Sequence, residues 1–182
     1  LLVDATEPNV TLSTSLPTPT RATPHPSELQ RWQLSLAGTA LDPLLNTGAA
    51  GSGLQSLAIT IYDPAGAIAG EGTQQVGVDG SGNWHLDYLF LDEPDGQFRI
   101  EAIVTDRVGN AQTVTLASVT FDGTAPEVAH TTPLPAEVLS DTLIAGGVIT
   151  DLVSISGVVT ETGSGVAAVE IAYVPTDLGS PH

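Results

Sequence analysis

Residues 79–90, DGSGNWHLDYLF, decide the fold class of this chain. The segment opens with Asp-Gly followed by Ser-Gly-Asn, a turn signal typical of tight connections between strands. Every second residue after it is large and apolar: Trp84, Leu86, Tyr88 and Phe90. An alternation of period two predicts a half-buried β-strand, with these side chains inward and His85 outward.

The same alternation recurs on both sides of this segment. Residues 31–42, 54–64, 95–106 and 111–121 show it, with Val114, Leu116 and Val119 as the expected inward residues of the last. Residues 8–14 add a first strand, and no helical apolar period runs for long. About seven short strands separated by turn signals predict an all-β fold, an antiparallel β-sandwich. A barrel is the alternative.

Composition excludes several classes of function. The 182 residues carry a net charge of −17, with four arginines and no lysine. Nucleic acids and anionic membrane surfaces both require clustered cations, so neither is an expected partner. No apolar run reaches the length of a membrane span. The absence of cysteine removes disulfides, zinc thiolates and cysteine nucleophiles.

The chain repeats itself. VDATEPNVTLSTS (3–15) matches FDGTAPEVAHTTP (121–133), with Asp4 and Asp122 118 positions apart. SLAGTALD (35–42) then matches SISGVVTE (154–161), and GSGLQSLAITI (51–61) matches GSGVAAVEIAY (163–173). The offset falls from 119 to 112, which indicates a loop insertion near residues 43–50 of the first copy. Three anchors in one order predict two related modules.

The second copy covers only the first part of the first. We therefore expect a complete module at 1–121, with a Pro/Thr-rich surface loop at 17–27, and an incomplete module at 122–182. The lack of methionine suggests a piece of a longer protein. A half-sandwich leaves an apolar face and strand edges uncovered, so strand complementation by another chain or by the rest of the precursor is one hypothesis. The other hypothesis is that the sequence ends before the module does.

The junction between the copies resembles that of tandem bacterial Ig-like domains. VTDRVGNAQTVTL followed by FDGTAPEV has the Asp-x-x-Gly-Asn turn and the Asp-x-Thr-Ala-Pro opening of such arrays, and DGSGNW resembles their entry into a middle strand. The resemblance implies an Ig-like sandwich from an extracellular stalk, an adhesin or an accessory module of a secreted enzyme. It also implies Ca²⁺ where modules join.

The best candidate ligands for such an ion are Asp106, Asn110 and Asp122, with Glu161 approaching from the next module. Calcium takes six to eight oxygens from Asp, Asn and loop carbonyls. The competing interpretation is that Asp106 and Asn110 only stabilise a turn, because Asx side chains bond nearby amides. The acids Asp92, Glu93 and Asp95 are expected to be solvated loop residues.

No arrangement for catalysis is visible. The four histidines are scattered without metal-ligand spacing, and no Gly-x-Ser-x-Gly elbow occurs. Trp32, Trp84 and Tyr88 fit the core phase, which leaves few aromatics to stack on a glycan. We therefore expect a non-catalytic, extracellular structural or adhesive module of a bacterial surface or secreted assembly, with neighbouring modules as partners. The alternative is a glycan- or protein-binding accessory module of a secreted enzyme.

Overall fold

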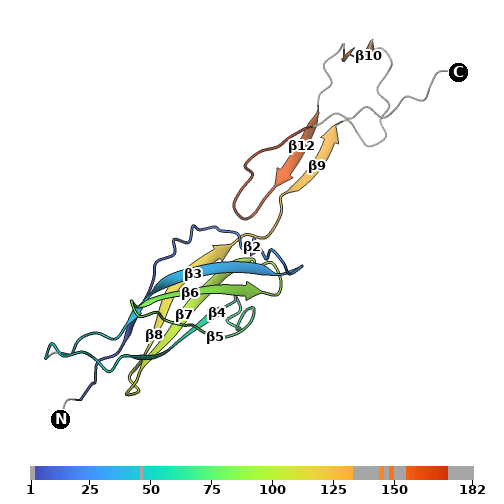
Figure 1. Ribbon diagram of the computed structural model, residues 1–182. Helices are drawn as coiled ribbons and strands as arrows, with labels where there is room; N and C mark the ends of the chain where they lie inside the picture. Colours follow the sequence, from blue (N-terminus) through green and yellow to red (C-terminus); the bar gives the residue numbers. More distant parts are fainter. Residues whose placement is uncertain (1–2, 46, 133–143, 146–147, 150–154, 172–182) are drawn as a thin grey trace. The chain divides into compact units, whose positions relative to one another are not determined.

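The computed structural model describes residues 3–45, 47–132, 144–145, 148–149 and 155–171 (Figure 1). The chain divides into two units, Leu1–Thr124 and Ala125–His182. The described residues form strands and loops. They contain no helix, and therefore no helix that is long and apolar enough to cross a membrane. The prediction of an all-β chain is confirmed for this part of the protein.

The first unit contains two four-stranded antiparallel sheets. Its strands are β1 (Asn9–Leu12), β2 (Thr23–Pro24), β3 (Trp32–Leu41), β4 (Leu54–Tyr62), β5 (Gln74–Gln75), β6 (Asn83–Phe90), β7 (Gly96–Asp106) and β8 (Ala111–Phe121). In one sheet β6 pairs along one edge of β3, and β1 and β2 share the other edge. The second sheet has the order β5-β4-β7-β8.

One hydrophobic core joins the two sheets, which gives a sandwich-like arrangement. Its fully buried side chains come from both sheets, among them Leu36, Ile59, Tyr88, Ile100 and Val104. The three phenylalanines of the chain, Phe90, Phe98 and Phe121, contact one another edge to face with ring centroids 5.2–5.8 Å apart. Such tilted contacts add specific geometry to the burial of apolar area. The alternation seen in the sequence therefore predicts the inward faces of β3, β4, β6 and β7 correctly.

A β-bulge changes the phase of β8. Its pairing with β7 shifts between Ile100 and Glu101, so that Leu116 is passed over in the register. A bulge lets two residues oppose one, after which the other set of side chains points inward. For this reason Val114 and Val119 both pack on the core although they are an odd number of positions apart, with Leu116 only partly buried between them.

The Pro/Thr-rich loop 17–27 is more structured than the sequence predicts. Thr20 forms a bridge to Phe121 and β2 pairs with β3, while Ala22 is buried. Arg21 forms an ion pair of 2.8 Å with Glu93. Glu93 is therefore not simply a solvated loop acid. Asp95 also has a partner, because it accepts a hydrogen bond from the Gly123 amide at 3.2 Å.

The second unit contains two strand pairs in its described residues: β9 (Glu127–Thr132) with β12 (Ser156–Thr160), and β10 (Ile144–Ala145) with β11 (Val148–Ile149). The expected incomplete module at 122–182 also includes 133–143 and 172–182, which lie outside the described residues. Residues 163–171 were matched in sequence to β4 and have no strand pairing in the structure.

The pairing of β9 with β12 has the register of β1 with β3. Val10 lies opposite Ala40, and their counterparts Val128 and Val159 lie opposite each other. The irregularity after this stretch also recurs: two consecutive amides, of Ser13 and Thr14, donate to the Ala37 carbonyl. The counterpart of Ala37, Ser156, marks the register shift in the second unit.

A glycine makes each of these pairings possible. A Cβ at Gly38 would lie 1.9 Å from the Thr11 carbonyl oxygen and 2.6 Å from the indole of Trp84. A Cβ at Gly157 would lie 2.7 Å from the carbonyl oxygen of Ala129, the counterpart of Thr11. Neither position has room for a side chain, because backbone atoms cannot give way as a flexible side chain can.

We predict that Gly38→Ala destabilises the first unit by about 1–3 kcal/mol, the usual range for overpacking in a core. Urea unfolding followed by tryptophan fluorescence measures this, since both tryptophans belong to the first unit. Gly77→Ala is the matched control, because a Cβ there meets nothing within 4 Å. Equal midpoints for the two variants would contradict the role assigned to Gly38.

Candidate metal centre

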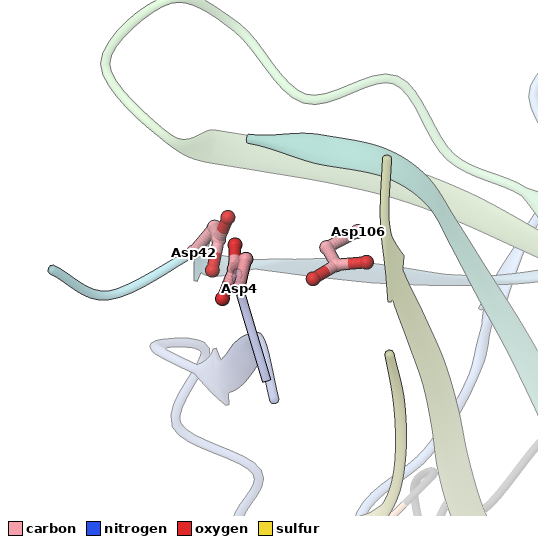
Figure 2. A group of neighbouring side chains, drawn as sticks. All are labelled: Asp4, Asp42 and Asp106. Atoms are coloured by element: carbon pink, nitrogen blue, oxygen red, sulfur yellow. The ribbon is translucent and has the colours of Figure 1, made fainter. Parts of the chain in front are cut away.

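Three carboxyl groups converge at one end of the first unit. Asp4 belongs to the segment before β1, Asp42 directly follows β3, and Asp106 is the last residue of β7. One oxygen from each lies within 4.8 Å of the others. Figure 2 shows the three groups turned toward a shared space from three separate segments. The ends of β3 and β7 and the segment before β1 thus place acids that are far apart in the sequence in a single cluster.

Asp106 is the buried member of the cluster, with no exposed surface. Its Oδ1 accepts hydrogen bonds from the amides of Val108 and Asn110 at 3.0 and 2.8 Å, and its Oδ2 accepts one from Asn110 Nδ2 at 2.7 Å. Burial raises the pKa of Asp106, but these bonds and one from the Ser52 side chain outweigh it, so the pKa lies below its ordinary value. Asp106 is therefore ionised at neutral pH.

Asp4 and Asp42 bind the glycine-rich loop that precedes β4. The Ser52 amide donates to Asp4 Oδ2 and the Gly53 amide donates to Asp42 Oδ2, both at 2.6 Å. Gly51 passes so close that a Cβ would lie 2.5 Å from Asp42 Oδ2. Hydrogen bonds from the amides of Thr6 and Ser52 are the main reason that the pKa of Asp4 is lowered. The Gly-Ser-Gly segment is thus shaped around two carboxylates.

One oxygen of the cluster lacks a partner within the described residues. Asp42 Oδ1 is buried and accepts no hydrogen bond. A buried carboxylate oxygen without a partner is costly, and a cation beside it removes that cost. Hard cations such as Ca²⁺ prefer several carboxylate oxygens and complete their shell with carbonyls and water. The three neighbouring carboxylates of Asp4, Asp42 and Asp106 therefore have the chemistry of a divalent-cation site.

Arg107 offers a second way to neutralise the cluster. Its guanidinium lies 3.5 Å from the position a Cβ would take at Gly53, whose amide binds Asp42. No ion pair within 4 Å joins Arg107 to an acid in the described part of the chain. A metal ion and the arginine are thus competing counter-charges, and titration with a metal separates them.

The structure brings two of the three predicted ligands together. Asn110 lies beside Asp106 as a hydrogen-bond donor. Its Nδ2 donates to Asp106 Oδ2 and, at 3.3 Å, to the carbonyls of Asp4 and Thr6. Asp122 follows the other end of β8, a strand of 11 residues, and so lies about 36 Å away at 3.3 Å per residue. Asp122 therefore cannot share an ion with Asp106. Its Oδ1 accepts a bond from the Thr124 amide.

Sequence reasoning missed Asp4 and Asp42 as members of the site. A signal existed, because both copies carry an acid at each of these places: Asp122 corresponds to Asp4, and Glu161 to Asp42. In the second unit Glu161 accepts hydrogen bonds from the amides of Thr162 and Gly163. The repeated acids thus stand at matching positions of the two copies, a signal that appears only when the copies are aligned.

Other candidate sites have structural roles. His85 is exposed, as predicted, and lies 3.6 Å from Asp87. Asp79 accepts bonds from the amides of Ser81 and Asn83, which confirms that DGSGN is a turn. Trp84 and Tyr88 are buried, so their faces are not open to a sugar ring. In the described residues the acid cluster is accordingly the strongest site for a small ligand.

Comparison with known proteins adds no relationship, since no protein-family model and no curated protein matches the chain. The function must therefore be argued from the geometry described above.

We predict that Ca²⁺ stabilises the first unit, because it binds the folded cluster and not the separated acids of the unfolded chain. At 100 times its dissociation constant, a ligand adds about 2.7 kcal/mol to the free energy of unfolding. Thermal unfolding of the full chain, in Ca²⁺ and in chelator, measures the effect. Asp42→Asn should abolish the response.

Asp92→Asn is the control for this experiment, because it removes an equal charge from a loop acid outside the cluster. It should keep the wild-type response to Ca²⁺. A wild-type melting temperature that is the same in Ca²⁺ and in chelator would show that Arg107 or water, and not a metal ion, balances the carboxylates.

The lowered pKa values of Asp4 and Asp106 predict acid sensitivity. A carboxyl whose pKa is lower in the folded state stabilises the fold above its ordinary pKa of about 3.9 and loses this contribution as the pH falls. We expect the free energy of unfolding in chelator to drop between about pH 5 and pH 2, and Asp106→Asn to flatten that dependence. Urea unfolding across this pH range is the measurement, and an unchanged slope in the variant would refute it.

Proposed function

We propose that the chain is a non-catalytic structural or adhesive part of an extracellular bacterial assembly, built from Ig-like sandwich modules in series. One complete module is the first unit, and the second unit is the front portion of another. The observation that carries this proposal is the common register of β1–β3 and β9–β12, which includes its irregularity and its glycine. Unrelated strand pairs have no physical reason to agree in register, irregularity and glycine position.

The openings of the two copies also share a turn. The Thr6 amide donates to Asp4 Oδ1 at 3.0 Å, and the Thr124 amide donates to Asp122 Oδ1 at 3.3 Å. A proline follows each turn, at Pro8 and Pro126. Asp-x-Thr turns of this kind fix the direction in which the chain enters its first strand. The similarity of the entries supports two modules of one kind.

Mechanical linkage is a function that this architecture suits. Proline fixes its own φ and keeps the preceding residue extended, so Pro126 limits the conformations of the short linker 122–126. The net charge of −17 gives neighbouring molecules a mutual repulsion that opposes clumping. A cation held by Asp4, Asp42 and Asp106 would tie the entering segment to two strands of its own sandwich, and thereby stiffen the entry to the module.

Labelling of intact producing cells tests the proposal, with an antibody raised against the full chain. We expect label on cells that have not been permeabilised, or protein in the culture medium, and we expect no saturable signal when the full chain is applied to a glycan array. Retention of the protein in the cytosol would refute the proposal. Saturable glycan binding that is lost when loop residues are changed would favour an accessory binding module instead.

A further inference from the structure

The second unit carries an open apolar groove of about 610 Å³. Its valine and isoleucine side chains come from three segments: Val128, Ile155, Val159, Val166, Val169 and Ile171. Exposed apolar side chains in such a contiguous patch are uncommon on the surface of a folded domain and indicate a binding surface. The question is what covers them.

The first unit indicates what could cover these side chains, because each of them has a counterpart there. In the same order, the counterparts are Val10, Leu36, Ala40, Leu54, Leu57 and Ile59. All of them belong to the hydrophobic core or pack against it. Val128 is 68% exposed where Val10 is 6%, and Ile171 is 68% exposed where Ile59 is buried completely. The groove therefore corresponds to parts of both sheets of the first unit, where β6 lies beside β3 and β7 and β8 continue the sheet of β4.

Gly157 indicates which of these neighbouring strands would lie beside β12. The counterpart Gly38 lies opposite Trp84 of β6, whose indole fills the space above the glycine. Gly157 is part of the groove lining and has the same close approach to its neighbouring strand. Both tryptophans of the 182 residues belong to the first unit, so residues 125–182 contain no indole that could lie over Gly157.

The free edge of β12 gives the direction and register. β3 pairs with β1 on one edge and with β6, antiparallel, on the other. Within the described residues β12 pairs with β9 alone. The edge that corresponds to the β6 side of β3 therefore presents backbone amides and carbonyls for strand addition.

We propose that this groove is the docking site for an antiparallel strand that lies outside residues 125–182 and has the side-chain pattern of β6. The donated strand places a tryptophan over Gly157 and a leucine opposite Ile155, as Trp84 and Leu86 lie opposite Gly38 and Leu36. Main-chain hydrogen bonds to β12 provide affinity, and the alternate apolar side chains provide specificity. The inference rests on the proposed relationship between the two modules, and adds the chemistry of the partner.

A peptide with the sequence of residues 79–90 is the probe, added to the ¹⁵N-labelled full chain. We expect saturable binding, with amide shifts concentrated in Ser156–Thr160. Replacing the tryptophan in the peptide, Trp84→Ala, should weaken binding about tenfold or more, since a buried aromatic anchor dominates such contacts.

Two neighbouring residues of β12 provide matched variants of the chain. Val159 lines the groove, and Val158 does not. Val159→Asp should abolish peptide binding, and Val158→Asp should leave it within about twofold of wild type, because adjacent side chains on a strand face opposite sides. Ile171→Asp is a second groove variant outside any strand, which guards against loss of β12 itself.

Equal binding by both valine variants, or by the Trp84→Ala peptide, would overturn the proposal. So would the absence of binding to a folded chain. Sedimentation of the chain alone adds a further test, because a dimer that Val159→Asp dissociates would make a second copy the occupant. None of these failures would affect the localisation experiment on which the structural role depends, so the two proposals can fail separately.

Discussion

The lack of a side chain at Gly38 is the constraint on which the first sandwich depends. The carbonyl of Thr11 and the indole of Trp84 both occupy the space that a Cβ would need. β1 can therefore pair closely with one edge of β3 while β6, on the other edge, lays its tryptophan across the same strand. The indole of Trp84 thus lies against β3 and joins the core residues of both sheets.

A second constraint operates at the end of the sandwich where Asp4, Asp42 and Asp106 meet. Asp106 is buried at the end of β7, where the amides of its own turn stabilise the negative charge. The other two acids use their oxygens to hold the amides of Ser52 and Gly53. The cluster thus fastens the entering chain and a long loop to the strands, and it leaves an excess of negative charge at this end of the sandwich.

The sequence was sufficient for most of the fold, since period-two alternation identifies inward residues from local information alone. The same method could not place the bulge at Leu116, because a bulge depends on the pairing of β8 with β7 and not on β8 itself. Ala22 was missed for a similar reason: its segment is rich in proline and threonine, yet contacts from Phe121 and Glu93 hold it. The acid cluster forms only when three chain segments come together. Of its three acids, only Asp106 stands in a local sequence motif, so the other two could not be predicted from their own segments.

The two units show how burial depends on the opposite layer of a sandwich as much as on the sequence of a strand. Val10 and Val128 lie in the same register on corresponding strands, and only the first is covered. Residues 166–171 have no strand pairing, whereas the corresponding part of β4 is held between β5 and β7. The same strand pairing, with its glycine and its register, thus occurs with the apolar face covered in the first unit and exposed in the second.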